Sequence, residues 1–300
     1  MKAPLAALAR GAALLACVAL FDDHSAPAQE TQPAGQTQPA SPAQPEAAAP
    51  AAKVVAAFNP ARSDEKAIAI VDQVMKSYGA QTWAGTRFLK FTWFIQRGDT
   101  RRNERTHTWD IQRQRSRLEG KTSDGKLLIA TSDHTTKTGQ ASLDGQLLFE
   151  ADAKKYTDLA HSTLINDSYW LIMQFKLKDP GIRLRYEGEL AAGPITYDKV
   201  QVSFDDGTGL TSKDKYWIFV NRATKLIERW SYVLQGSGAD VSPVAWDWQE
   251  LTDIGGMKFP LRKTQAEGET SIVMENVQVL TEVPDVVFTG ASTVDPATIK

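Results

Sequence analysis

The sequence predicts a mainly β (α+β) fold: a single strongly curved antiparallel sheet, or half-open β-barrel, of about 10–11 strands, with an N-terminal helix and an inserted helical lid. Three observations predict it. Short strand-like segments follow one another with short connections from residue 89 to residue 280. Two segments have helical periodicity instead, one before the strands and one among them. Asp-Gly dipeptides, which suit tight hairpin turns, lead directly into strand-like segments at 124–125 and 144–145.

The overall composition is that of a globular protein. The chain has 300 residues, 42% hydrophobic and 23% charged, with a net charge of −2. A wholly disordered chain is therefore excluded, and a dedicated nucleic-acid binder, which normally carries a basic excess, is not expected. The single Cys allows neither an intrachain disulfide nor a Cys-based metal cluster.

The N-terminus has the pattern of a secretory signal peptide. Lys2 and Arg10 precede an apolar run at 11–21, which two Asp residues end. The run is too short for a transmembrane helix, which needs roughly 20 apolar residues. Residues 1–28 are therefore predicted to be a signal peptide, and the protein to be periplasmic or secreted.

Two processing sites stay open. Ala26-Pro27-Ala28 is an A-x-A cleavage site, which makes Gln29 the first mature residue. Alternatively, residues 14–17 (LLAC) resemble a bacterial lipobox, which makes Cys17 a lipidated first residue and anchors the protein to a bacterial membrane. An uncleaved anchor is a third alternative.

Residues 29–60 are predicted to be a disordered linker. They are rich in Ala, Pro and Gln and have no apolar periodicity, so they bury too little surface to become ordered. Residues 61–300 contain no second segment of this kind and are predicted to form one β domain.

The first helix is predicted from Ser63, a favourable N-cap, to Gly79, a typical helix terminator. The apolar residues between them follow helical spacing: Ala67, Ile70, Val71, Val74 and Tyr78. This apolar stripe needs a surface to cover, and the strands that follow provide one.

The strands begin with the residues 89–96, in which Leu89, Phe91, Trp93 and Ile95 share one face. Residues 105–111 alternate in the same way. The two Asp-Gly dipeptides each lead into a strand, and further strands are predicted at 182–188, 197–204, 216–221, 226–234, 244–251, 258–264 and 270–280.

Residues 150–175 interrupt the strands with helical spacing. The segment becomes nearly all apolar at 169–173, and Asp179-Pro180-Gly181 ends it in a turn. A helix placed between strands must cover a sheet face or close the mouth of a barrel, so this segment is the predicted lid. Its lid residues are Tyr169, Trp170, Ile172 and Met173.

No catalytic motif was found. The sequence has no G-x-S-x-G elbow, no P-loop and no G-x-G-x-x-G. His107, His134 and His161 are 27 residues apart and lack the local spacing of a metal site. The carboxylates form no recognisable pair, although a hydrolase of unrecognised type stays open. We therefore predict no enzyme, no cofactor and no metal.

The aromatic residues point to a hydrophobic ligand. Most of the eight Trp lie in predicted strands, several sharing a face with other aromatics. A curved sheet lined by such side chains, with a helix across it, suits an apolar ligand. The predicted ligand-lining residues are Leu89, Phe91, Trp93, Trp230, Tyr232, Trp246 and Trp248.

Several segments resemble an uncharacterised family of secreted bacterial domains. They are 166–171 (NDSYWL), 175–181 (FKLKDPG), 213–218 (KDKYWI) and 223–227 (ATKLI). The wider layout, including a late PDVVF at 284–288, is similar to the periplasmic lipoprotein carriers of the LolA and LolB type. The resemblance implies a half-open barrel lidded by helices that carries acyl chains, and it covers about residues 63–290.

The sequence thus predicts an exported envelope protein that binds a lipid, a lipoprotein acyl chain or another hydrophobic molecule, and that contacts membranes only if lipidated or during transfer. The alternative is a non-enzymatic interaction module, in which the same sheet has a filled core and binds an envelope protein.

Overall fold

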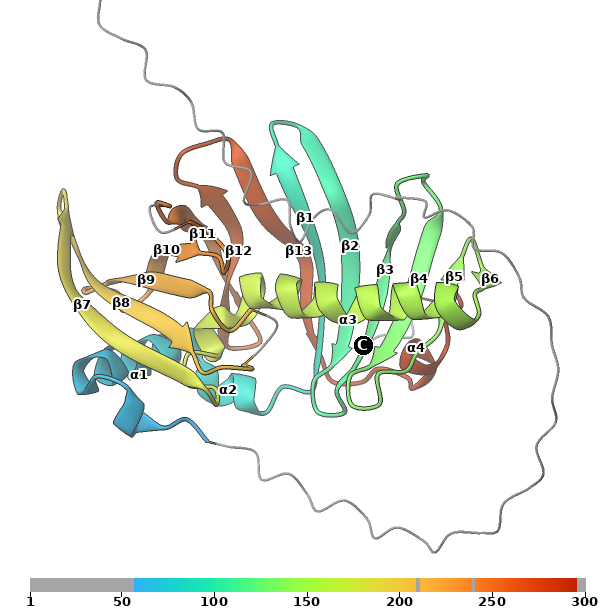
Figure 1. Ribbon diagram of the computed structural model, residues 1–300, viewed down its shortest axis with the longest axis horizontal. Helices are drawn as coiled ribbons and strands as arrows, with labels where there is room; N and C mark the ends of the chain where they lie inside the picture. Colours follow the sequence, from blue (N-terminus) through green and yellow to red (C-terminus); the bar gives the residue numbers. More distant parts are fainter. Residues whose placement is uncertain (1–56, 209–210, 239–240, 296–300) are drawn as a thin grey trace, which may run out of the picture.

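The structure is a computed structural model that describes residues 57–208, 211–238 and 241–295 (Figure 1). The predicted signal peptide at 1–28, with Cys17, and almost all of the linker at 29–60 lie outside the described residues. In the described part of the chain, no helix combines the length and apolar character that crossing a membrane requires.

The described strands form one continuous antiparallel sheet of 13 strands, in the order β6-β5-β4-β3-β2-β1-β13-β12-β11-β10-β9-β8-β7. The predicted fold class is confirmed, and the sheet does not close. The strands are β1 (Phe88–Arg97), β2 (Thr100–Asp110), β3 (Arg115–Lys121), β4 (Leu127–Asp133), β5 (Ala141–Leu143), β6 (Gln146–Leu147), β7 (Ile182–Ala192), β8 (Ile195–Phe204), β9 (Lys215–Asn221), β10 (Ile227–Val233), β11 (Val244–Ile254), β12 (Met257–Gln265) and β13 (Thr270–Leu280).

The helices cover parts of both faces of this sheet. They are α1 (Glu65–Tyr78), α2 (Ala80–Ala84), α3 (Glu150–Ile172) and α4 (Val286–Thr289), with short 3-10 turns η2 (Pro60–Arg62) and η3 (Met173–Phe175). The two strands that the sequence analysis did not single out are β3 and β5. Both hairpins with an Asp-Gly turn form as predicted, and Asp144 and Gly145 take the positive φ values of 48° and 81° that such a turn needs.

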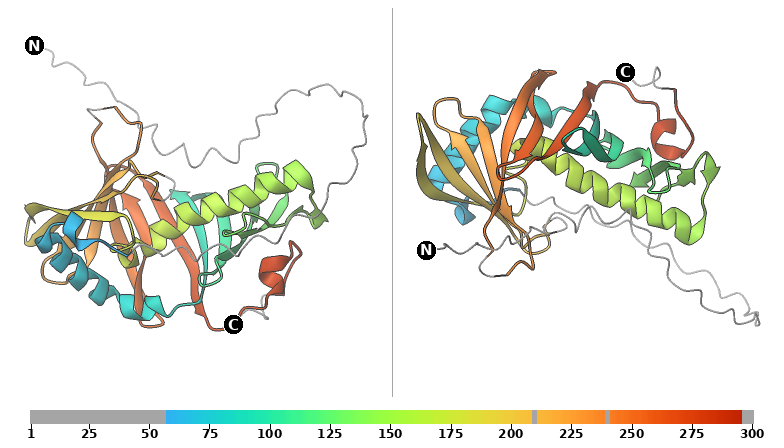
Figure 2. Two further views of the ribbon diagram at one scale, coloured as in Figure 1. Left: turned by 60° about the horizontal axis from the view of Figure 1, so that its bottom comes forward. Right: turned by 90° about the horizontal axis from the view of Figure 1, so that it is seen from above.

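The sheet has a curled half, β7–β13, and an open half, β1–β6 (Figures 1 and 2). Helix α3 runs across the concave face from one half to the other. Its N-terminal part packs Leu159 and Ala160 on Leu118, Leu128 and other side chains of the open half. Its C-terminal part joins the large core of the curled half. The inserted helix therefore covers the sheet, as predicted.

Helix α1 lies beside the edge strand β7. The sequence predicted Ser63 as its N-cap, but Asp64 takes that position. The reason is that both residues bind the edge of the sheet: Ser63 Oγ accepts a hydrogen bond from Leu184 N at 2.9 Å, and Asp64 Oδ2 accepts one from Tyr186 N at 2.8 Å. The start of α1 thus covers part of an otherwise unpaired strand edge.

Helix α4 packs on the face opposite α3, against β3 and β4. Phe288 stacks on Phe88 with ring centres 6.1 Å apart. Arg117 of β3 donates to the backbone oxygens of Gly290 and Ser292, at 3.0 and 2.7 Å. Residues 284–292 therefore cover the convex face at β3 and β4, where α3 covers the concave face.

Candidate functional site

The aromatic side chains of the concave face form one cluster around Trp170 of α3. The Trp170 ring meets those of Trp230 and Trp246 edge-on, with ring centres 4.7 and 5.1 Å apart. Trp230 of β10 and Trp246 of β11 are directly opposite in the strand register, so their side chains share a face. Tyr232 adds a further edge-on contact to Trp170 at 6.3 Å.

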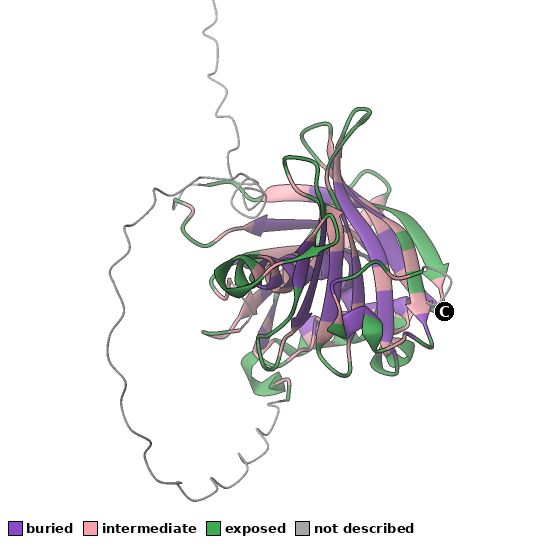
Figure 3. Cartoon of the chain, turned by 90° about the vertical axis from the view of Figure 1, so that its right-hand side faces the viewer, coloured by how far each residue is buried: buried purple, intermediate pink, exposed green. Residues whose placement is uncertain are grey.

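The structure brings the predicted lining and lid residues together in one core. The cluster includes Leu89, Phe91, Trp93, Trp230, Tyr232, Trp246 and Trp248 from the sheet, and Trp170, Ile172 and Met173 from the lid, with Tyr169 packed against it. None of the seven lining side chains is more than 8% exposed, and the buried residues form a band through the sheet (Figure 3). In this conformation α3 itself occupies the aromatic face. Their role in ligand binding stays a prediction.

A pocket of about 380 Å³ lies beside α3, between the helix and the ends of β2, β4, β7 and β8. Its size is within the range of small-molecule pockets, roughly 300–1,000 Å³. Its lining is mainly apolar and comes from both halves of the sheet and from the helix: Trp109, Gln114, His134, His161, Leu164, Ile165, Ser168, Tyr169, Lys176, Asp179, Pro180, Ile182, Phe204 and Thr208.

Two histidines meet at one side of this pocket. His134, just after β4, and His161 of α3 contact each other through their Nδ1 atoms, with ring centres 4.6 Å apart. His134 Nε2 also lies 3.0 Å from Ser116 Oγ. Burial, followed by the charge of His161, lowers the pKa of His134 to about 4, and burial also lowers the pKa of His161. Both rings are therefore neutral at pH 7, and one Nδ1–H donates to the other Nδ1.

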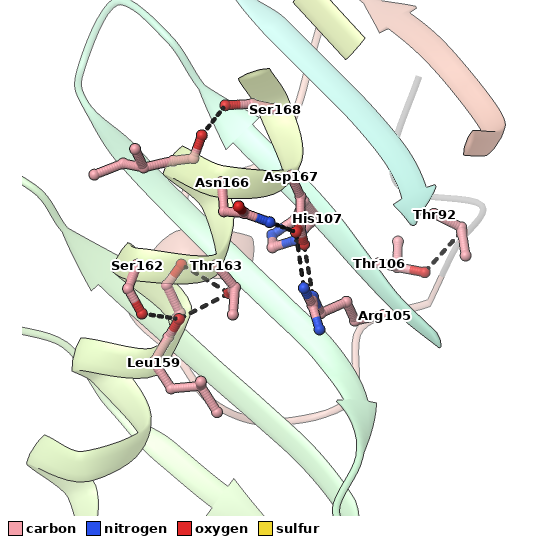
Figure 4. Close-up of polar contacts among 12 residues, drawn as sticks. Thr92, Arg105, Thr106, His107, Leu159, Ser162, Thr163, Asn166, Asp167 and Ser168 are labelled. Carbon is pink, nitrogen blue, oxygen red and sulfur yellow. Dashed lines mark hydrogen bonds and ion pairs between the residues drawn. The ribbon is translucent and has the colours of Figure 1, made fainter. Parts of the chain in front are cut away.

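A buried ion pair fixes the C-terminal part of α3 to strand β2 (Figure 4). Arg105 donates to both oxygens of Asp167, with Nε–Oδ2 and Nη2–Oδ1 distances of 2.6 and 2.7 Å. His107 Nε2 lies 2.7 Å from Asp167 Oδ2. All three side chains are buried, and the guanidinium also lies 4.3 Å from the centre of the Trp93 ring.

The protonation states of Asp167 and His107 depend on two opposing effects, burial and contact with a charged neighbour. Burial acts to raise the pKa of the Asp167 carboxyl, but the charge and hydrogen bonds of Arg105 outweigh it and lower that pKa to about 2. Burial lowers the pKa of His107 despite its contact with Asp167. The carboxylate is thus ionised and can only accept, so His107 Nε2 carries the proton and donates. His107 Nδ1 has no hydrogen-bond partner among the described residues.

The three histidines do not converge on one centre. His107 binds Asp167, whereas His134 and His161 bind each other. Among the residues described, no group of three or more His, Cys, Asp or Glu side chains is placed to hold a metal ion.

The sequence analysis did not find the ion pair. Its signal was present: Arg105 and His107 occupy the inward-facing positions of a strand whose other members include Trp109. A charged residue at such a position needs a buried partner. The sequence does not tell which carboxylate that partner is, because Asp167 is 62 residues away from Arg105.

Comparison with known proteins gave structural matches alone: no family model matches the chain, and no curated protein matches it. The chain is similar to a DUF1329 family protein from Desulfovibrio piger, with 13% identity and a TM-score of 0.42, over 75% of this chain and 98% of that one. It is similar to a LolA superfamily protein from Nitrosomonas europaea, with 12% identity and a TM-score of 0.38, over 75% and 97%.

A third similar structure is an outer membrane lipoprotein-sorting protein domain from Vibrio parahaemolyticus, with 6% identity and a TM-score of 0.40, over 75% of this chain and 96% of that one. These structures include a LolA superfamily protein, the group to which the wider layout of the sequence is similar. At such identities and TM-scores they say nothing further about what this chain binds.

Proposed function

We propose that this chain is an exported envelope protein that binds a lipid, a lipoprotein acyl chain or another hydrophobic ligand between α3 and the concave face of the sheet, and acts as a non-enzymatic carrier. One observation carries the proposal. The pocket beside α3 adjoins the aromatic core: Leu164 and Tyr169 line the pocket and also pack in that core.

The mechanism is sequestration from water. An apolar chain enters the pocket, and it extends along the aromatic face as the end of α3 that bears Trp170 moves aside. Each methylene group so buried contributes about 0.8 kcal/mol. The displaced α3 side chains lose contacts of the same kind, so affinity depends on how much more surface the ligand buries than the helix did.

The location and the domain boundaries belong to the same proposal. The predicted signal peptide at 1–28 directs export and is removed, the linker at 29–60 precedes the β domain at 61–300, and the mature protein is periplasmic or secreted. The lipobox alternative, with Cys17 lipidated, holds the same domain at a membrane.

A second candidate function has its own observation. Trp170 fills the space between Trp230 and Trp246, and the predicted lining residues are almost completely buried by the protein itself. A core filled in this way fits an interaction module that binds an envelope protein by its edges or loops.

Native mass spectrometry of the mature protein, purified from a bacterial periplasm, separates the two. A bound mass of several hundred daltons, absent after denaturation and identified as a lipid after solvent extraction, is expected for a carrier. A ligand-free mass, together with no uptake of added fatty acid or phospholipid, contradicts the carrier and leaves the interaction module.

A further inference from the structure

Lys263 is a buried cation on the concave face of the curled half. It lies in β12, directly opposite Trp248 of β11 and Ile272 of β13 in the strand register, so its side chain shares a face with theirs. Trp248 and Ile272 both belong to the aromatic core. The Lys263 side chain has no exposed surface. The amine therefore points among the aromatic side chains that the proposed ligand would contact.

The amine has few partners. Lys263 Nζ donates to the backbone oxygen of Pro260 and lies 5.1 Å from the centre of the Trp248 ring. An ammonium group offers three donors, and none of the described carboxylates forms an ion pair with it. Burial alone lowers the pKa of Lys263 well below its usual value. Burial therefore favours the neutral form of the amine.

Lys263 can be compared with the other two buried cationic side chains of the described residues. Arg105 has Asp167, and Arg117 has Glu119 together with two backbone oxygens. Lys263 differs from both in having no acidic partner among the described residues. A Met or Leu would fill the same space without placing an amine in apolar surroundings, so core packing does not account for a lysine there.

We infer that Lys263 is the receptor for the acidic headgroup of an anionic amphiphile, namely the carboxyl group of a long-chain fatty acid. This inference rests on the proposed function and names its ligand class. The carboxylic acid gives its proton to Lys263 Nζ, and the resulting ammonium and carboxylate form a buried ion pair. The hydrocarbon chain lies along the face that carries Trp248 and Trp230.

The aromatic surroundings strengthen such a pair. In a water-excluded site two opposite charges attract more strongly than in water, and the face of Trp248 also stabilises an ammonium group. Because Lys263 is enclosed, the headgroup reaches it when side chains of the concave face move, which the proposed binding already requires. A phosphate monoester offers the same anionic oxygens, so the test includes both headgroups.

The test compares three ligands with the same chain, dodecanoic acid, dodecyl phosphate and 1-dodecanol, by isothermal titration calorimetry on the full-length mature protein. The wild type is expected to bind dodecanoic acid roughly 10- to 100-fold more tightly than 1-dodecanol, which is the range for hydrogen bonds to a charged group. Lys263→Met should lose this preference and keep its affinity for the alcohol, whereas Lys263→Arg should retain it. Lys258→Met, on the same strand but exposed and paired with Asp253, is the matched control.

A second measurement needs no variant. In ¹³C NMR of carboxyl-labelled dodecanoic acid bound to the wild type, the carboxyl should stay ionised at a pH where the free acid is protonated. A bound acid that titrates like the free acid overturns the inference.

The possible outcomes distinguish a failure of the proposed function from a failure of the inference about Lys263. If none of the three ligands binds, the proposed function fails and the inference fails with it. If acid and alcohol bind equally, or if Lys263→Met keeps the preference for the acid, hydrophobic binding stands and Lys263 is not the receptor. If dodecyl phosphate binds in a Lys263-dependent way and dodecanoic acid does not, the anion receptor stands and its ligand carries a phosphate group.

Discussion

Replacing Asp167 with Asn removes one charge from the contact that fixes α3 to the sheet. The substitution keeps the size of the side chain. Its amide can accept with one oxygen, but it no longer offers the two carboxylate oxygens that Arg105 binds at 2.6 and 2.7 Å. The guanidinium of Arg105 is buried, so it loses its counter-charge in a place that water does not reach.

The expected loss of folding stability is large because both side chains of the ion pair are buried. Removing one partner of a buried ion pair destabilises a protein by about 3–5 kcal/mol. For a domain of this size, each kcal/mol corresponds to about 2–4 °C in Tm, so we expect Tm to fall by about 6–20 °C.

The same residue predicts a pH dependence. The pKa of Asp167 is lowered to about 2, below its value in the unfolded chain, so its stabilisation is complete above about pH 4 and is lost as pH falls from there to about 2. The size of this acid-dependent part is about 2 kcal/mol. Asp167→Asn should lack it.

Thermal and denaturant unfolding followed by circular dichroism at pH 7 measure the effect. The matched control is Asp158→Asn on the same helix, whose pair with Lys154 is exposed and should contribute at most about 0.5 kcal/mol. A loss of less than about 1 kcal/mol for Asp167→Asn would refute the reasoning, because it would mean that Arg105 finds water or another anion. The double variant Arg105→Met/Asp167→Leu should recover part of the loss, because it leaves no buried charge but removes the acceptor of His107 Nε2–H.

Three further predictions use other parts of the molecule. Because the folded-state pKa of His134 is lowered to about 4 from an unfolded value near 6.5, wild-type stability should fall as pH drops through that window, and His134→Gln should flatten this part of a pH series of unfolding curves. Trp170→Ala should lower the free energy of unfolding by about 3–5 kcal/mol in a urea titration, whereas Phe149→Ala, at a residue 73% exposed, should change it by no more than about 0.5 kcal/mol. Gly79→Ala should be more destabilising than Gly125→Ala in the same titration. Both glycines have φ near 85°, which costs a residue with a side chain roughly 1–2 kcal/mol. A Cβ at position 79 would also collide with a backbone oxygen, whereas a Cβ at position 125 would meet open space.

Hydrophobic periodicity predicted the helices and strands that have one clearly apolar face. Strand β1 presents Leu89, Phe91 and Trp93 to the core, and α1 buries Val71 and Val74, as their spacing indicates. The prediction that a helix at 150–175 covers the sheet is confirmed as well, because an apolar helical segment between strands has few other places to pack.

Strand β3 was missed because its buried face does not look apolar. Its sequence is RSRLEGK, yet Ser116, Arg117 and Leu118 are all buried. Arg117 is buried by partners distant in sequence, the backbone oxygens of Gly290 and Ser292. Partners in a remote segment cannot be identified from the strand itself, and the same is true of Arg105, whose partner Asp167 is 62 residues away. The sequence therefore indicates the apolar part of the concave face and not its buried charges.

The contact between Arg105 and Asp167 also distinguishes two routes by which a ligand reaches the aromatic face. If α3 must lift from the sheet, this contact has to break before the ligand enters, and weakening it lowers the barrier. We then expect Asp167→Asn to take up a fluorescent fatty acid at least about tenfold faster than the wild type in stopped-flow mixing. A tenfold change in rate corresponds to about 1.4 kcal/mol, which is less than the stabilisation that the substitution removes. If the ligand instead enters by the pocket beside the helix, past His134 and His161, the ion pair stays intact and the uptake rate does not change although stability falls. An unchanged rate for Asp167→Asn, with a changed rate for His161→Ala, would exclude the lifting helix and assign entry to the pocket.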